Sequence, residues 1–197
     1  GVAAVTAWRA LIDHAGLEPA EDALIHGGSG GVGHAAVQIA AAAGANVVAT
    51  AAPQYHGAVA GLGAATVLDY GRDDLAEAVR AATEGGVDVT LDHRLDEYLQ
   101  FDADVAAHEG RIVGIGENDP AIGLSNDGVA RAKDLRVAFM SMFNTPDLSV
   151  ALGRVSRLIG RGDLAIEVAR TYDLDEVADA HRDVLADSVL GKLVVVP

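Results

Sequence analysis

The chain has 197 residues, half of them apolar, and a formal net charge of −15 that arises from 29 acidic and 14 basic side chains. This charge repels nucleic acid and anionic membrane surfaces, no apolar run approaches the ~18 residues of a membrane span, and the N-terminus has no signal-peptide pattern. The absence of cysteine excludes disulfides and thiolate-bound zinc. We therefore expect a cytoplasmic protein without a metal site.

The length allows one well-buried domain and part of a second. The acid excess is combined with only two lysines, a composition that keeps a surface hydrated where salt is abundant. Two origins fit it equally well: a protein of a salt-loving organism, or an ordinary acidic protein from a GC-rich genome.

Short apolar runs alternate with helical apolar spacing from the N-terminus to about residue 143. The expected strands are 23–26, 46–51, 65–70, 86–92, 111–116 and 135–143, and the expected helices are 2–15, 32–43, 55–63, 72–83 and about 97–108. Strands separated by helices of about ten residues imply right-handed βαβ crossovers. The predicted fold class is α/β: a doubly wound parallel sheet of the Rossmann type, with six strands and helices on both faces.

The sixth expected strand carries apolar side chains on both sides. One side has Leu135, Val137, Phe139 and Phe143, and the other has Met140 and Met142. Methionines of this kind usually fill a core, and contact with a ligand is the alternative.

The remaining segment, 147–197, predicts a helix, a strand at 164–172, a second helix and a closing strand. It is interpreted as a C-terminal tail on a first domain at 1–146. Three arrangements are open for its strands: pairing with each other, pairing with another chain, or edges whose backbone amides and carbonyls stay exposed.

A glycine cluster in the stretch LIHGGSGGVGHAAVQIA, residues 24–40, lies between an expected strand and an expected helix. Gly28, Gly30 and Gly33 have the spacing G-x-G-x-x-G, which allows a sharp turn, close approach of a pyrophosphate and close helix packing, respectively. Ser29 and Gly31 can add donors to the free amides of the helix N-terminus. The sequence therefore predicts a dinucleotide site, and a ligand-free glycine turn is the alternative.

His26 ends the strand before this loop. A histidine in that position is more often a hydrogen-bonded core residue than a catalyst, and we adopt that interpretation. No catalytic residue is assigned within the chain.

Charged residues are missing where they would select the nucleotide. No acidic side chain occurs from Gly27 to Leu68, so the carboxylate that usually binds an NAD ribose is absent, which favours NADPH over NADH as cofactor. No lysine or arginine occurs between Arg9 and Arg72 either. The candidate contacts of a 2′-phosphate are Thr50, Gln54, Tyr55, His56, Tyr70 and Arg72.

Six stretches together resemble the quinone oxidoreductase (zeta-crystallin-like) branch of the medium-chain dehydrogenase/reductase family. They are 1–11, 24–51, 63–70, 86–92, 110–116 and 191–197. The resemblance implies a zinc-independent reductase that transfers hydride from NADPH to a quinone or an enone-type small molecule.

The resemblance also implies positions around the cofactor. Ser29 to Val32 would hold the pyrophosphate, and Tyr70 would lie at the adenosine end. The segment that follows Asp92 and the strand end at Gly116 would border the nicotinamide ribose, with Thr6 near the nicotinamide.

The chain departs from the family pattern at three places. Tyr55 or His56 stands roughly where a lysine or arginine is usual, and His93 and Arg94 replace a Val-Gly pair. The third departure is that the chain starts after the N-terminal catalytic domain of about a hundred residues that family members have. In the family, the C-terminal tail returns to that domain. We therefore expect this chain alone to be inactive.

Three functions remain open: the cofactor domain of a quinone or enone reductase, a dinucleotide-binding module without turnover, and an enoyl-reductase unit of a larger assembly. Either enzyme function predicts a homodimer formed through the sixth strand, which would be the edge of the sheet.

Overall fold

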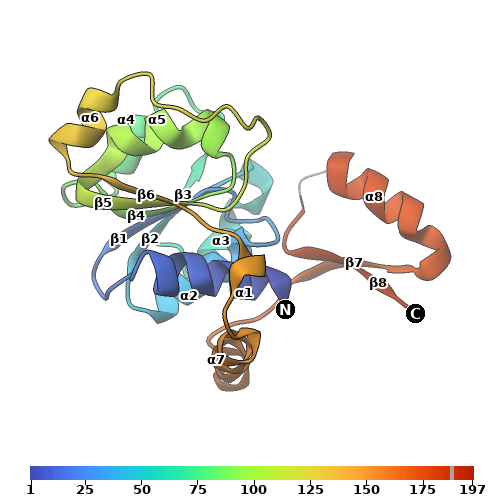
Figure 1. Ribbon diagram of the computed structural model, residues 1–197. Helices are drawn as coiled ribbons and strands as arrows, with labels where there is room; N and C mark the ends of the chain where they lie inside the picture. Colours follow the sequence, from blue (N-terminus) through green and yellow to red (C-terminus); the bar gives the residue numbers. More distant parts are fainter. Residues whose placement is uncertain (187–188) are drawn as a thin grey trace.

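The computed structural model describes residues 1–186 and 189–197, and its main feature is a six-stranded parallel sheet between two layers of helices (Figure 1). The strands are, in spatial order, β3 (Thr66–Asp69), β2 (Asn46–Ala51), β1 (Asp22–Ile25), β4 (Val87–Asp92), β5 (Ala106–Gly114) and β6 (Arg136–Phe139). This order confirms the predicted doubly wound Rossmann sheet. The order reverses between β1 and β4, so the crevice for a ligand lies at the carboxyl ends of these two strands.

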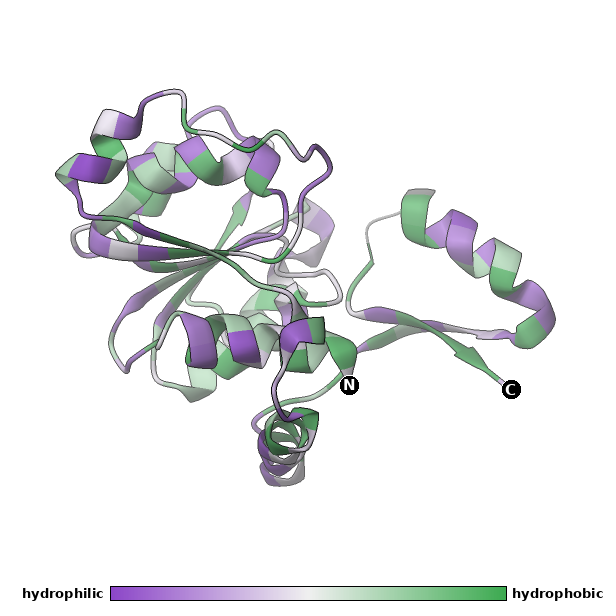
Figure 2. Cartoon of the chain, in the orientation of Figure 1, coloured by the Kyte–Doolittle hydropathy of each residue, from purple (hydrophilic) through white to green (hydrophobic). Residues whose placement is uncertain are grey.

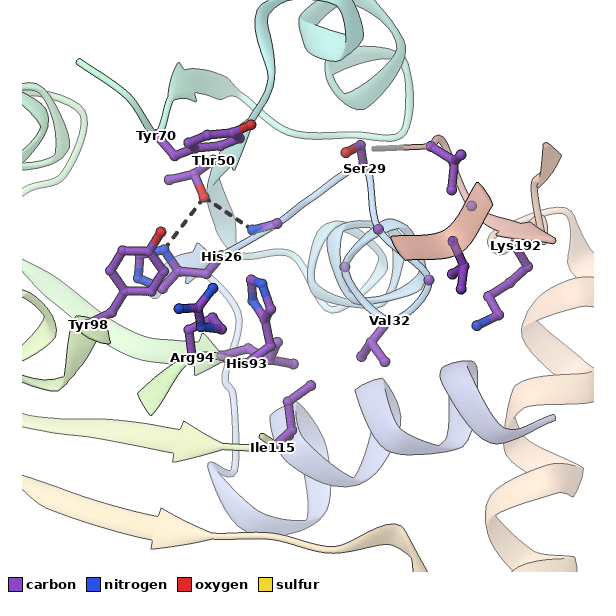
Figure 3. Close-up of a pocket in the computed structure, with 18 of the residues that line it drawn as sticks. His26, Ser29, Val32, Thr50, Tyr70, His93, Arg94, Tyr98, Ile115 and Lys192 are labelled. Atoms are coloured by element: carbon purple, nitrogen blue, oxygen red, sulfur yellow. Dashed lines mark hydrogen bonds between the residues drawn. The ribbon is translucent and has the colours of Figure 1, made fainter. Parts of the chain in front are cut away.

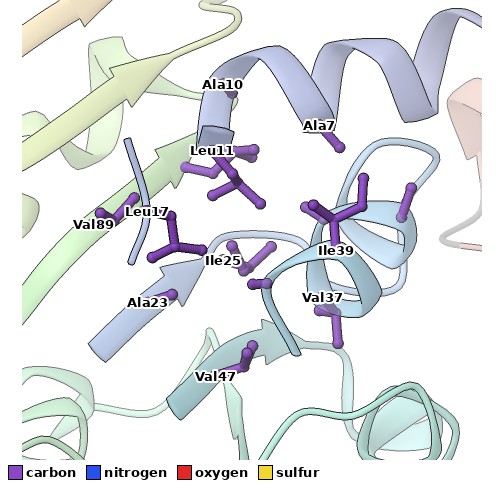
Figure 4. Close-up of a cluster of buried hydrophobic side chains, with 14 of the residues drawn as sticks. Ala7, Ala10, Leu11, Leu17, Ala23, Ile25, Val37, Ile39, Val47 and Val89 are labelled. Atoms are coloured by element: carbon purple, nitrogen blue, oxygen red, sulfur yellow. The ribbon is translucent and has the colours of Figure 1, made fainter. Parts of the chain in front are cut away.

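The central strand β1 explains how the two layers are held. Ala23, Leu24 and Ile25 are all fully buried, as expected for a parallel strand covered on both faces. Because successive side chains point to opposite faces, Ala23 and Ile25 join one core while Leu24 joins the other. Figure 4 shows the first core, where Ile25 lies among alanines and branched side chains.

Two groups of helices cover the sheet. On one face lie α1 (Val2–Trp8), continued by a π-helix (Arg9–His14), then α2 (Gly33–Ala42), a 3₁₀ turn (Pro53–Tyr55) and α3 (His56–Gly61). On the other lie α4 (Leu75–Ala81), α5 (Leu95–Val105) and α6 (Asp127–Ala132). Helix α6 was not among the expected elements; its cap is the Asn126 side chain, which accepts from the Gly128 amide.

The edge strand β6 ends earlier than the apolar run predicted. After Phe139 the chain turns into a 3₁₀ helix (Met142–Asn144), because the Ser141 side chain accepts from the Phe143 amide. Met140 is buried in the core, as predicted for core filling, whereas Phe139 and Phe143 are 66% and 89% exposed. The sheet therefore ends in an edge with exposed aromatic side chains.

The tail consists of α7 (Leu148–Arg161), β7 (Val168–Asp173), a 3₁₀ turn (Leu174–Glu176), α8 (Val177–Ala186) and β8 (Lys192–Val196). Strands β7 and β8 pair with each other in parallel, which decides among the three arrangements left open by the sequence. Figure 2 shows that β8 is apolar over most of its length. No helix in 1–186 or 189–197 is long and apolar enough to span a membrane.

Gln38 ties the tail to the Rossmann domain. Its side-chain amide donates to the Ala165 carbonyl, and its carbonyl oxygen accepts from the Ala165 amide. Leu164, next to it, is buried in the main core. Because Gln38 uses the backbone groups of Ala165, β7 begins at Val168 and not at Leu164, where a strand was expected.

The core makes a stability prediction. Ile25→Ala should lower the free energy of unfolding by about 3 kcal/mol, because it leaves a cavity beneath the central strand. Leu185→Ala is the control, since Leu185 is 88% exposed and its loss should cost less than about 0.5 kcal/mol. Urea unfolding followed by circular dichroism measures both, and equal effects would contradict this account of the core.

Candidate functional site

The glycine loop joins the end of β1 to the start of α2 and is held against the end of β2. Gly28 donates its amide to the Thr50 carbonyl at 2.7 Å, and Gly27 donates its amide to Thr50 Oγ1 at 3.1 Å. Gly30 donates to the Gly27 carbonyl at 2.9 Å and closes the turn. Gly27 itself has φ +66°, a backbone conformation that residues other than glycine rarely adopt.

The third glycine of the motif is required by space. A Cβ on Gly33 would lie 2.0 Å from the Gly27 carbonyl oxygen, so only glycine lets α2 begin this close to the strand. This is the helix packing that the motif predicts. The backbone amides at the N-terminus of α2 consequently lie next to the loop.

A cavity of about 560 Å³ opens in front of this loop, at the carboxyl ends of the strands (Figure 3). Its size is in the range of cofactor sites. The residues that line it from the Rossmann domain include Ser29, Gly30, Gly31, Val32, Gly33, Thr50, Tyr70, Leu91, His93, Arg94, Tyr98 and Ile115. The switch point of the sheet therefore carries a ligand-sized space.

The structure brings together seven of the twelve predicted cofactor contacts: Ser29, Gly30, Gly31, Val32, Gly33, Thr50 and Tyr70 line the cavity. Gly28 lies behind the loop, where a Cβ would approach Ala49 and Val59. Tyr55 lies on the 3₁₀ turn after β2, outside the lining.

The other three predicted contacts are also outside the lining. Thr6 donates its hydroxyl to the Val2 carbonyl within α1, and Asp92 is completely buried. Gly116 accepts from the Leu95 amide. Cofactor contact by these residues stays a prediction.

Lys192 is a charged cavity residue that the sequence analysis did not predict. Other lining residues that were not predicted as contacts include His26, Leu91, Tyr98, Val184 and Leu193. Gly191 donates its amide to the Ser29 carbonyl at 2.8 Å, which fixes the start of β8 against the glycine loop. The Lys192 Nζ consequently lies 2.9 Å from where a Cβ on Gly31 would be. Two signals in the sequence pointed to it: Lys192 is one of two lysines in the chain, and it lies in the stretch 191–197 that carries the family resemblance.

A buried histidine–carboxylate pair lies beneath the loop. His26 Nε2 is 2.8 Å from Asp102 Oδ1, and the two side chains are at most 1% exposed. The His26 ring stacks on Tyr98 with centroids 4.6 Å apart. His26 is thus a hydrogen-bonded core residue, as its position in the sequence suggested.

Burial and charge act against each other in this pair. Burial lowers the pKa of His26, but the charge and hydrogen bond of Asp102, with a smaller effect of Asp92, outweigh it, and the pKa is raised. Burial also raises the pKa of Asp92 to about 7, with a contribution from the nearby Asp102 charge. Asp92 and Asp102 each keep one buried oxygen without a donor, which a proton shared between them would satisfy.

A sequence model of the zinc-binding dehydrogenase family matches residues 62–195, well over half of the chain. The chain belongs to the zinc-binding dehydrogenase family. Among curated relatives, it is 35% identical over 96% of its length to the phthioceranic/hydroxyphthioceranic acid synthase of Mycobacterium tuberculosis. It is 36% identical over 97% of its length to the spectinabilin polyketide synthase system protein NorB of Streptomyces orinoci. The chain spans 9% of each of these relatives.

Solved structures with the same fold carry several activities. An NAD-dependent alcohol dehydrogenase has a TM-score of 0.91 and 28% identity, with 100% of this chain and 57% of that one covered. The CurK enoyl reductase has a TM-score of 0.83 and 29% identity, with 98% of this chain and 59% of that one covered. The Escherichia coli quinone oxidoreductase complexed with NADPH has a TM-score of 0.88 and 26% identity, with 100% of this chain and 63% of that one covered.

The family's name implies zinc, but the residues of this chain do not fit a zinc site. The sequence has no cysteine, and within 1–186 and 189–197 no three His, Cys, Asp or Glu side chains are grouped to hold a metal.

The buried carboxyl pair predicts that stability falls as pH rises. The pKa of Asp92 is raised from 3.8 to about 7 in the folded state, so the folded chain keeps a proton that the unfolded chain releases above about pH 4. The free energy of unfolding therefore decreases as the pH rises from about 4 to about 7. The raised pKa of His26 acts in the same direction, with its contribution lost as pH rises through the folded value. At 1.36 kcal/mol per pKa unit, Asp92 accounts for a loss of up to about 4 kcal/mol.

Asp92→Asn tests this prediction, because its amide can donate to Asp102 as the protonated acid does. The variant should be more stable than wild type at about pH 8 and similar at about pH 5, as measured by thermal unfolding. The exposed Asp175→Asn is the control and should change neither value. A pH dependence unchanged in Asp92→Asn would refute the shared proton.

Proposed function

We propose that this chain binds NADPH and is the cofactor domain of a zinc-independent reductase that acts on an electron-poor carbon–carbon double bond. The observation that carries the proposal is the cavity at the switch point, where the glycine loop and Lys192 line the same space. A protein with a net charge of −15 needs such local donors to hold an anion, because its overall field repels one.

The pyrophosphate is assigned to the loop from Ser29 to Val32. The free amides and the dipole of α2 stabilise its negative charge there, and the Lys192 ammonium adds a full positive charge. Gly31 leaves room for the Lys192 side chain, since a Cβ would come within 2.6 Å of its Cδ. This arrangement supports anion binding at the centre of the cavity.

The adenosine is assigned to the side where Thr50, near the end of β2, and Tyr70, just after β3, line the cavity. No carboxylate stands at the end of β2, so nothing there repels a 2′-phosphate, and this supports NADPH over NADH. The nicotinamide is assigned to the side with Val32, Leu91 and Ile115, whose apolar side chains can exclude water.

The cofactor would supply the chemistry at that end. When bound, NADPH would supply a hydride for the β-carbon of the acceptor; uptake of a proton at the α-carbon would complete the saturated product and leave NADP⁺. The chain's own part is to orient the ring and keep water away from it. The residues that bind the acceptor and deliver the proton are assigned outside this chain.

The similarity to polyketide synthases and to an enoyl reductase supports an α,β-unsaturated acyl group as the acceptor. It favours the enoyl-reductase unit of a larger assembly among the functions left open. A quinone is the second candidate, supported by the likeness to the quinone oxidoreductase. His93 and Arg94, which replace the expected Val-Gly pair, are the feature that favours a binding module without turnover.

Binding of NADPH tests the proposal directly. Fluorescence titration of the chain should give tighter binding of NADPH than of NADH. In the natural polypeptide that contains the chain, NADPH oxidation should depend on an added enoyl thioester more than on a quinone. Tight binding without hydride transfer to either acceptor would leave the binding module as the function.

Lys192→Gln should weaken NADPH binding about tenfold, because one charge beside the pyrophosphate is lost. The loss should shrink as salt is added, since this side chain is exposed to screening. Arg131→Gln removes a cation of the same charge from an exposed position on α6 and serves as the matched control. Equal affinities for the two variants would show that Lys192 does not contact the cofactor.

We also propose a homodimer that pairs β6 across a two-fold axis. The support is the edge position of β6 and the exposed side chains of Val137, Phe139 and Phe143. Light scattering in high salt should give the mass of two chains, and Phe139→Asp should give the mass of one. A wild-type monomer would refute the dimer.

A further inference from the structure

Thr50 connects the buried ion pair to the glycine loop. Its Oγ1 accepts from the Gly27 amide at 3.1 Å and lies 3.5 Å from His26 Nδ1. Both contacts are drawn in Figure 3, where the hydroxyl of Thr50 points toward His26 and the loop. The other ring nitrogen of His26 lies against Asp102 at 2.8 Å. A continuous chain of polar contacts therefore leads from α5 to the first turn of the loop.

One arrangement of hydrogens satisfies every member of this chain. Asp102 accepts from the Nε2–H of His26, which leaves Nδ1 free to accept from the Thr50 hydroxyl, and the Thr50 oxygen accepts from the Gly27 amide. Each group then donates or accepts as its chemistry allows, and all the bonds run in one direction from the loop to the carboxylate. The neutral imidazole is the form that completes the chain.

We propose that Asp102 and His26 are positioning residues of the dinucleotide site, which act through the Thr50 hydroxyl to hold the Gly27 amide and the entry to the glycine loop. The inference rests on the proposed function, since a loop held in this way matters for a ligand that binds the loop. Neither Asp102 nor His26 is assigned a contact with the reacting atoms.

A proton on His26 Nδ1 opposes this arrangement. The imidazolium donates at both nitrogens, so the Thr50 oxygen then receives two donors and its own hydrogen loses its acceptor. Binding of the dinucleotide should therefore weaken as pH falls through the pKa of His26.

Several groups set the pH at which this happens. Asp102 and the stacked Tyr98 face His26 from α5, and Asp92 faces it from the end of β4. His93, after β4, interacts with His26 electrostatically, and its own pKa is lowered by partial burial and by the charges of His26 and Arg94. Asp102 is the strongest of the groups that raise the pKa of His26, so its removal should move the transition to lower pH.

Calorimetric titration with NADP⁺ between about pH 5 and pH 8 tests the proposal. The affinity of the wild type should decrease as the pH is lowered. Asp102→Asn should shift the midpoint of that decrease to lower pH. Thr50→Val should bind about tenfold more weakly than wild type at pH 8 and lose the His26-dependent part of the pH profile, while Thr50→Ser should recover most of the affinity. Any titration of the 2′-phosphate itself affects wild type and variants alike.

Thr83→Val is the matched control. The Thr83 hydroxyl donates to the Val79 carbonyl at the end of α4, so its loss removes a comparable hydrogen bond away from the cavity. It should leave NADP⁺ affinity and its pH profile unchanged. Wild-type behaviour in Thr50→Val, or an unmoved midpoint in Asp102→Asn, would overturn the proposal.

A measurement without ligand separates this proposal from the proposed function. In nuclear magnetic resonance spectra of the wild type, the chemical shift of the Gly27 amide should change with pH at the same midpoint as the shifts of the His26 ring nitrogens. In Thr50→Val the amide shift should not follow His26. If wild type binds no dinucleotide but this coupling is present, the proposed function fails and the positioning network stands as a support of the loop alone. If the Gly27 amide does not follow His26, the positioning role is wrong whatever the ligand.

Discussion

A chain with a formal net charge of −15 can hold an anionic ligand only where backbone amides and a few cations are concentrated against its overall field. In this structure the glycine loop, with Lys192 beside it, brings such groups together, and the neighbouring strands and helix fix its shape. Hydrogen bonds to Thr50 fix its first turn, and the absence of a side chain at Gly33 allows α2 to start within contact of the turn. The order of the sheet then leaves the space in front of the loop open as a cavity.

The C-terminal tail is part of this site and not a separate appendage. Gln38 binds the backbone of Ala165 on one side of α2, and Gly191 binds Ser29 in the loop on the other. These contacts bring Lys192 to the cavity from a strand that is outside the six-stranded sheet. In an acidic protein, a single lysine placed in this way has a larger effect on the local potential than any average property of the surface.

The buried group of His26, Asp102 and Asp92 is costly for a domain to maintain, because charges without solvent must be paired. One imidazole beside two carboxyl groups limits the net buried charge when the two carboxyl groups share a proton. The group lies directly beneath the glycine loop and is linked to its first turn through the Thr50 hydroxyl, which accepts from the Gly27 amide. The same location makes both stability and the proposed binding sensitive to pH.

The sequence by itself determined the features that depend on local pattern. Alternating apolar runs and helical spacing indicated the parallel sheet, and the glycine spacing between a strand and a helix indicated the loop with Ser29 to Gly33, because each of these signals lies within about twenty residues. Where β6 ends depended on a turn made by Ser141, which an apolar run does not reveal. Only the tertiary structure decided that Lys192 reaches the loop, that Gln38 shortens β7, and that Asp102 pairs with His26. Each of these contacts joins residues more than seventy positions apart, and hydrophobic periodicity carries no information about which distant polar groups will meet once the chain has folded.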